Sequence, residues 1–104
     1  MLNNNSIAEE VTPLEFYLSQ NYPNPFKDKT TIKYCVSYKT HVNLTVLDAE
    51  RNEIEKLVDE EKKPGTYEVE FQSAIGSRQL AIGDYFYRLQ AGDYSIEKRM
   101  QLIK

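Results

Sequence analysis

Apolar and polar side chains alternate with a period of two residues in several short stretches of the chain. Three apolar side chains stand at alternate positions in each of the stretches 31–36, 41–46 and 67–71. Because successive side chains of a β-strand point to opposite faces, this pattern predicts strands that bury one face. The residues 38–40 between the first two stretches predict a tight connection.

Two weaker stretches leave alternatives open. Residues 54–58 predict a shorter strand, although the glutamates and lysines of 54–63 also permit a helix. The charged run 59–63 is expected to form a solvated loop. Pro64 and Gly65 follow it, and their backbone preferences suit a type II turn.

The C-terminal third of the chain predicts a hairpin that follows a long connection. Segment 72–82 has no sustained period, so we interpret it as a connection between two sheets. Strands are expected over 85–89 and 94–103. Gly92 between them suits the first central position of a type II′ hairpin turn.

Together these patterns predict an all-β fold, an immunoglobulin-like antiparallel β-sandwich of about seven strands. Turn signals recur at intervals of roughly 8 to 12 residues, and a length of 104 residues suits one such domain. We expect the domain to span residues 14–104. Residues 1–13 are a polar leader or the linker from a larger protein, and the linker is the preferred interpretation.

Aromatic residues near the start of the predicted hairpin sharpen this fold prediction. Gly83, Tyr85 and Tyr87 follow one another at alternate positions. Tyr85 stands two residues before the place of the second cysteine of antibody domains, as the residue of a tyrosine corner does. Tyr87 then occupies the cysteine position, so that the corner and aromatic packing replace the disulfide. The alternative is that both tyrosines are ordinary alternating core residues.

Composition argues against several classes of function. The net charge is −3 and the 13 Lys and Arg residues are spread thinly, which argues against nucleic-acid binding. The apolar runs are far shorter than the roughly 20 residues of a membrane-spanning helix, so we expect no transmembrane segment. Cys35 is the only cysteine and therefore forms no disulfide within the chain.

Candidate catalytic and metal-binding residues are few. His41 is the only histidine and is expected to be exposed at the start of a strand. Cys35 is expected to face away from the apolar side of its strand, in a structural position. A cation site or a plain solvated turn would explain the cluster Asp48, Glu50 and Glu53 equally well. We therefore predict no enzyme activity and no cofactor.

A proline-containing motif precedes the first strong strand. It consists of Asn21, Tyr22, Pro23, Asn24, Pro25 and Phe26. The two prolines restrict the backbone around Asn24 to extended or turn conformations, and we expect Tyr22 and Phe26 to hold the segment down.

This motif resembles the opening of the C-terminal sorting domain of the type IX secretion system of Bacteroidetes, also called the Por secretion system. The resemblance continues through 42–48, 64–69, 80–92 and 98–104 and includes Gly83, Tyr85 and Tyr87. The sequence departs from the family pattern at three places. They are Leu47 in place of a frequent Tyr, Arg51 and Asn52 in place of a Gly-Arg turn, and Phe71 and Gln72 in place of Trp-Asp.

The resemblance implies a non-catalytic C-terminal secretion signal domain that directs an N-terminal passenger across the outer membrane. Implied partners are the type IX secretion machinery and a sortase-like protease, which removes the domain or attaches the passenger to the cell surface. The implied location is the periplasm in transit and then the cell surface or the extracellular space. A structural relation to the immunoglobulin-like domains of flagellar hook-cap proteins is also implied.

The terminal strand is the candidate recognition site of such a signal. Basic residues gather there in an otherwise acidic chain, and an edge strand can also pair with a strand of a partner. We expect the machinery to recognise Lys98, Arg99, Met100, Leu102 and Lys104. In the alternative interpretation, the charges only protect an exposed edge from aggregation.

Two other functions remain as alternatives. The first is an immunoglobulin-like structural or adhesive module of a cell-surface protein that binds carbohydrate. It needs an exposed aromatic patch, for which Tyr17, Tyr38 and Phe86 are the candidates. The second is a free-standing cytosolic protein that begins at Met1.

Overall fold

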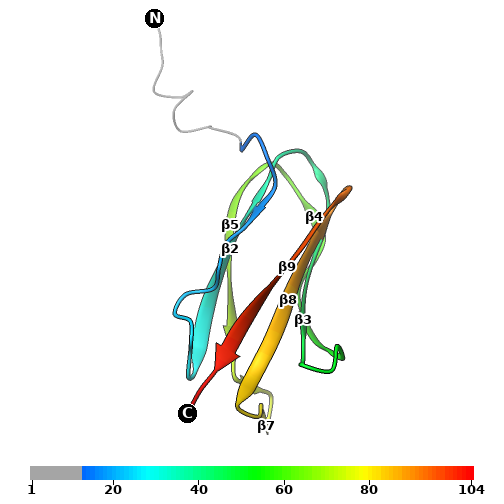
Figure 1. Cartoon of the computed structure of the whole chain (residues 1–104). Helices are drawn as coiled ribbons and strands as arrows, with labels where there is room; N and C mark the ends of the chain where they lie inside the picture. The colour runs from blue at the N-terminus through cyan, green and yellow to red at the C-terminus, as the bar shows by residue number, and fades with distance from the viewer. Residues whose placement is uncertain (1–12) are drawn as a thin grey trace, which may run out of the picture.

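The computed structural model describes residues 13–104, which form antiparallel strands and no helix (Figure 1). In chain order the strands are β1 Tyr17–Leu18, β2 Lys29–Val36, β3 Thr40–Leu47, β4 Glu53–Lys62, β5 Gly65–Gln72, β6 Ala74–Ile75, β7 Arg78–Gln79, β8 Gly83–Ala91 and β9 Tyr94–Leu102. Within residues 13–104 no helix is long and apolar enough to span a membrane. The predicted leader 1–13 lies outside the described residues except for Pro13.

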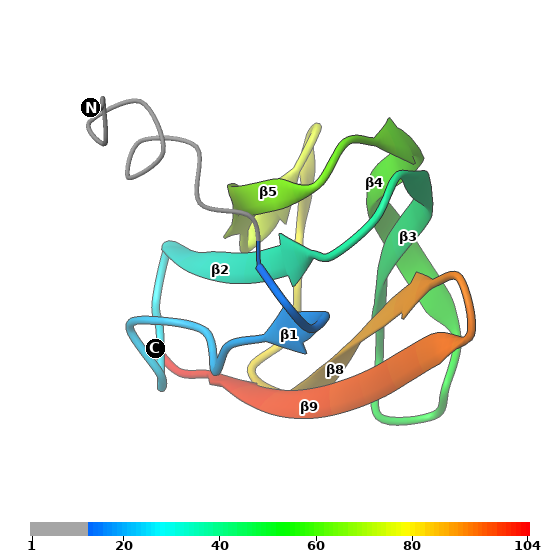
Figure 2. The same ribbon diagram turned by 90° about the horizontal axis from the view of Figure 1, so that it is seen from above.

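Two sheets face one another across the core, as the view from above shows (Figure 2). One has the order β1-β2-β5 and the other the order β4-β3-β8-β9. These are the A-B-E and C′-C-F-G orders of immunoglobulin-like domains. The remaining strands, β6 and β7, pair only with each other. The predicted sandwich of about seven strands is therefore confirmed.

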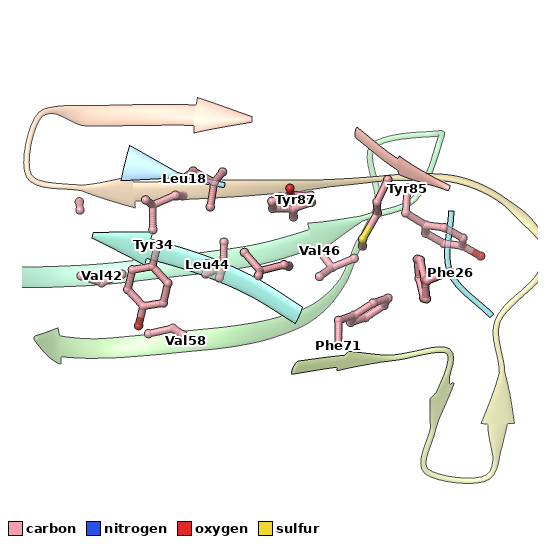
Figure 3. Close-up of a cluster of buried hydrophobic side chains, with 14 of the residues drawn as sticks. Leu18, Phe26, Tyr34, Val42, Leu44, Val46, Val58, Phe71, Tyr85 and Tyr87 are labelled. Atoms are coloured by element: carbon pink, nitrogen blue, oxygen red, sulfur yellow. The ribbon is translucent and has the colours of Figure 1, made fainter. Parts of the chain in front are cut away.

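Side chains from both sheets meet in one core (Figure 3). Tyr34 of β2 and Phe71 of β5 come from one sheet, and Leu44 of β3 and Tyr87 of β8 come from the other; all four are fully buried. The alternation predicted for these strands is what the structure shows. Each such side chain contributes about 1.5–3 kcal/mol through burial, so this core holds the domain together without a disulfide.

The prediction for the charged run 59–63 is wrong. Residues up to Lys62 continue β4, which pairs with β3 from Leu47↔Glu53 to Thr40↔Lys62. The helix alternative for 54–63 is wrong as well. A strand at the edge of a sheet carries exposed charges at little cost, so a charge run does not exclude a strand there.

The Pro64-Gly65 turn also differs from the prediction. Gly65 has a φ of 158°, close to extended backbone and far from the ~80° that a type II turn requires. The chain passes here from β4 of one sheet to β5 of the other, so it does not close a hairpin. The short connection 37–39 between β2 and β3 likewise crosses between the sheets.

The predictions for the C-terminal third are confirmed. Segment 72–82 connects the two sheets and contains the small β6-β7 ribbon. β8 and β9 form a hairpin, with Gly92 at a φ of 59° and Asp93 at a negative φ, as a type II′ turn requires. A Cβ atom at Gly92 would lie 2.3 Å from the hydroxyl oxygen of Tyr38, so a larger residue here would displace that exposed side chain, and the positive φ is what favours glycine.

Candidate functional site

Strand β9 forms one edge of the four-stranded sheet, and its basic residues point in different directions. Arg99 is exposed on the outer face, where its guanidinium lies 3.8 Å from the carboxylate of Asp84. Lys98, one position earlier, is half-buried on the opposite face, and Lys104 is exposed beyond the strand end. The cluster seen in the sequence is therefore not one patch in space.

The two apolar residues predicted for recognition lie in the core. Met100 and Leu102 are almost completely buried, and they stand opposite Tyr85 and Gly83 in the β8-β9 ladder. In the folded domain their side chains hold β9 against the sandwich. A partner that binds the folded domain therefore meets the backbone and the polar side chains of this strand.

The proline-containing motif lies beside the C-terminal end of β9 (Figure 2). The Phe26 N–H donates to the carbonyl of Gln101 at 2.9 Å, and the Ile103 N–H donates to the carbonyl of Phe26 at 2.8 Å. The Asn24 Oδ1 accepts from the Gln101 N–H at 3.0 Å. The Gln20 Nε2 donates to the carbonyl of Arg99 at 2.7 Å. Residues 20–26, here named the clasp, thus cover part of the β9 edge.

Asn21 organises the clasp from inside. Its side chain is buried, and its Nδ2 donates to the hydroxyl of Thr30 at 3.0 Å and to the carbonyl of Pro23 at 3.1 Å. The Thr30 hydroxyl in turn donates to the Pro23 carbonyl at 2.8 Å. Every buried side-chain nitrogen or oxygen within residues 13–104 has such a partner. This network fixes the loop that leads into β2.

Only one of the two aromatic residues of the motif holds it down. Phe26 is buried and its ring centroid lies 6.0 Å from that of Phe71, in an edge-to-face arrangement. Tyr22 is 80% exposed, so the expectation for its side chain is wrong. Its backbone is held instead, because Tyr22 and Thr31 exchange two hydrogen bonds of 2.9 Å. The peptide bonds before Pro23 and Pro25 are cis.

The tyrosine corner is present at Tyr85. Its hydroxyl donates to the carbonyl of Ala81, four residues upstream, at 2.6 Å. Tyr87 is also a core residue, and its hydroxyl donates to the Ser19 carbonyl at 2.7 Å and accepts from the Asn21 N–H at 2.8 Å. Burial raises the pKa of Tyr87 to about 12. Tyr87 thereby ties β8 to the start of the clasp at the place where antibody domains carry a disulfide.

The residues considered for catalysis or metal binding make contacts that stabilise strands and turns. The exposed His41 Nε2 lies 2.6 Å from the Asp59 Oδ1, and this hydrogen bond lowers the pKa of Asp59. Cys35 is half-buried with its Sγ 3.6 Å from the Thr66 hydroxyl, on the face away from the core as predicted. Asp48 accepts the backbone N–H groups of the turn that follows it, which lowers its pKa. In the part of the chain that the structure describes, no group of three or more His, Cys, Asp or Glu side chains could hold a metal ion.

The departures from the family pattern are accommodated. Arg51 has a φ of 74°, a conformation that favours glycine, which explains why glycine is usual there. Its guanidinium pairs with Glu97 of β9 and lies 4.6 Å from the ring centroid of Phe86. Leu47 and Phe71 are both buried, so each keeps its place in the packing.

The aromatic candidates for carbohydrate binding do not share a surface. Tyr17 pairs with Cys35 in β1 and is exposed on the outer face of the three-stranded sheet. Phe86 lies on the outer face of the other sheet beneath Arg51. Tyr38 lies in the 37–39 connection and packs against Phe16.

Sequence reasoning named Asn21 and Asn24 as motif residues, but it missed Gln20, Ser19 and the contacts that these polar residues make. Gln20 and Asn24 bind the backbone of β9 from more than seventy residues away. Asn21 and Ser19 supply the backbone groups that the Tyr87 hydroxyl bridges. The only available signal was the concentration of amide side chains beside the prolines.

Comparison with known protein families identifies a family that matches most of the chain. Residues 20–104 match the profile of a family described as "Secretion system C-terminal sorting domain". The match thus begins with the first residue of the clasp and includes the whole of β9. Neither the curated proteins nor the solved structures gave a match.

Proposed function

The chain belongs to the family of C-terminal sorting domains of the type IX secretion system, and we propose that it carries a larger N-terminal passenger out of the cell as a non-catalytic address. The passenger crosses the periplasm and reaches the cell surface or the extracellular space. The partners in this proposal are the type IX machinery and a sortase-like protease. Cleavage falls before Leu14, which is 95% exposed.

One observation carries this proposal: the opening motif of the family is hydrogen-bonded to its final strand. Asn24 and Phe26 bind the backbone of Gln101, and Gln20 binds that of Arg99. The two ends of the matched region therefore form one surface, although they are far apart in sequence. A receptor can recognise such a surface only on a folded domain, because an unfolded chain does not bring these residues together.

An export assay tests the proposal. Residues 14–104 are fused behind a signal peptide and a fluorescent passenger in a host that has a type IX system. We expect passenger fluorescence at the cell surface or in the medium. Deletion of residues 94–104, which include β9, should leave the passenger in the periplasm, because the deletion removes the edge strand and opens the core.

A matched variant separates charge from folding. Lys98, Arg99 and Lys104 all have side chains outside the core, so their joint replacement by Gln should leave the domain folded. A loss of export by this variant supports recognition through charge, and unchanged export refutes it. A passenger that stays in the periplasm with the intact, folded domain refutes the sorting function itself. A glycan screen that then gives a reproducible ligand would favour the adhesive module.

A further inference from the structure

The clasp covers only one half of the β9 edge. The backbone groups of Arg99, Gln101 and Ile103 face the clasp, as their hydrogen bonds show. Backbone groups of an antiparallel strand alternate in direction along the chain, so those of Ser95 and Glu97 point to the same side. Among residues 13–104 nothing binds them. No described residue therefore pairs with the edge from Ser95 to the N–H of Arg99.

No irregularity protects this open half. The register of β9 with β8 runs without a shift from Tyr94 to Leu102. The edge strand at the other side of the sheet, β4, has two register shifts against β3 and carries charges along most of its length. Register shifts are one means by which edge strands avoid pairing, so β9 lacks a protection that β4 has, although both strands carry charges.

The charges around the open half favour an acidic partner. Glu97 is neutralised, because its carboxylate pairs with Arg51 and lies 3.6 Å from the Arg88 Nε. Lys98 has no carboxylate within 4.0 Å among the described residues. Arg99 lies 3.8 Å from the carboxylate of Asp84, but its side chain is 68% exposed and remains accessible to a partner. These two cations lie on opposite faces of β9, so acidic residues on either face of an added strand meet one of them.

We propose that an acidic extended segment of a partner protein adds to the sheet along Ser95–Arg99, with the clasp marking the end of the added strand. This inference rests on the sorting function proposed above and names how that signal is recognised. Backbone hydrogen bonds supply the affinity, and Lys98 and Arg99 supply the preference for acidic residues. Half-buried Ile96, on the same face as Lys98, offers an apolar contact beside it.

Proline substitution tests strand addition directly. Glu97→Pro and Ser95→Pro each remove an N–H that points away from β8, which edge strands tolerate. Glu97→Gln and Ser95→Ala are the matched controls, since they change the same side chains and keep the N–H. We expect the folded proline variants to be exported about tenfold less than wild type and the controls at nearly the wild-type level.

Each combination of folding and export in these variants supports or overturns a stated part of the proposal. Folding is checked by thermal unfolding, and if Glu97→Pro is not folded, Ser95→Pro beside the turn decides. Folded proline variants with wild-type export overturn strand addition, while the sorting function stands. Failure of the wild-type domain in the same assay refutes the sorting function and this proposal with it. Wild-type export of the variant in which Lys98 and Arg99 are Gln overturns the acidic character of the partner.

Hydrogen exchange gives a second measurement that needs no variant. In the free wild-type domain the N–H groups of Ser95 and Glu97 should exchange rapidly, and the Gln101 N–H should be protected. Protection of Ser95 and Glu97 in the free domain would mean that the edge is already covered, and it would overturn the proposal.

Discussion

The two edges of the four-stranded sheet are protected by different means. β4 carries charges over most of its ten residues and has two register shifts. β9 has a continuous register and is covered over its C-terminal half by residues 20–26. Charges and bulges discourage any added strand, whereas a hydrogen-bonded segment covers only the residues that it reaches. This difference shows that the motif at residues 21–26 has two structural roles. It leads the chain into β2, and it covers the C-terminal half of the β9 edge.

The largest expected effect comes from removing the anchor of the clasp. Phe26→Ala deletes a fully buried ring beside Phe71 and should lower the free energy of unfolding by about 3–5 kcal/mol. Urea denaturation measures it. Tyr22→Ala is the control within the same motif, since its side chain is exposed and should change the value by less than about 0.5 kcal/mol. Equal effects of the two variants would contradict the anchoring role of Phe26.

A smaller loss is expected when the clasp is detached from β8. Tyr87→Phe leaves the buried N–H of Asn21 and the carbonyl of Ser19 without their partner, which should cost about 1–3 kcal/mol. The same variant should alter the response to alkali. The pKa of Tyr87 is raised from 10.0 to about 12, so its stabilisation is complete below pH 10 and declines as the pH rises toward 12.

Three other tyrosines, two buried and one partly buried, also have raised pKa values, and both proteins share those contributions. The comparison therefore isolates Tyr87: between pH 10 and 12 the wild-type protein should lose more stability than Tyr87→Phe does. Parallel curves for the two proteins would show that ionisation of Tyr87 is not coupled to unfolding.

A single hydrogen bond of the clasp should have a modest effect. Asn24→Ala removes the acceptor of the Gln101 N–H and should cost about 1 kcal/mol, with faster hydrogen exchange at Gln101. Lys27→Ala in the same loop is the control, because its side chain is exposed. If exchange at Gln101 were unchanged, the clasp would not close this part of the edge in solution.

The smallest effect on stability is expected at the other edge. Joint replacement of Glu60 and Glu61 by Thr should change the free energy of unfolding by less than about 0.5 kcal/mol, since both are exposed. It should nevertheless promote self-association, measured by sedimentation velocity, because it removes charges from an edge strand. Replacing Glu50 by Thr and Asp93 by Asn removes the same charge from two turns and serves as the control. Equal association of both would assign the effect to net charge.

Most of the fold was predictable because it follows from local patterns. The period of two placed β2, β3 and β5, and Gly92 placed the final turn. The charged end of β4 was not predictable in this way. Its strand is set by pairing with β3, and an edge position leaves its side chains free to be polar.

The candidate site was predictable in part. The edge position of β9 followed from its place at the end of a hairpin. Lys98 and Arg99 lie on two faces because successive side chains of a strand point to opposite sides. Whether a partner strand can reach them depends on which edge of the sheet is open, and only the fold decides that. The exposure of Tyr22 and the burial of Asn21 depend on contacts that no local pattern contains.

The sequence by itself determined β2, β3 and β5, the final hairpin and the family to which the domain belongs. It did so because side-chain alternation, turn residues and motifs act over a few neighbouring positions. Only the tertiary structure decided that residues 20–26 bind β9 and that, among residues 13–104, none pairs with the stretch from Ser95 to the N–H of Arg99. The two segments are more than seventy residues apart, so their hydrogen bonds depend on where the fold places each segment. Almost every residue carries the same backbone N–H and C=O groups, so the sequence does not mark which of them will pair.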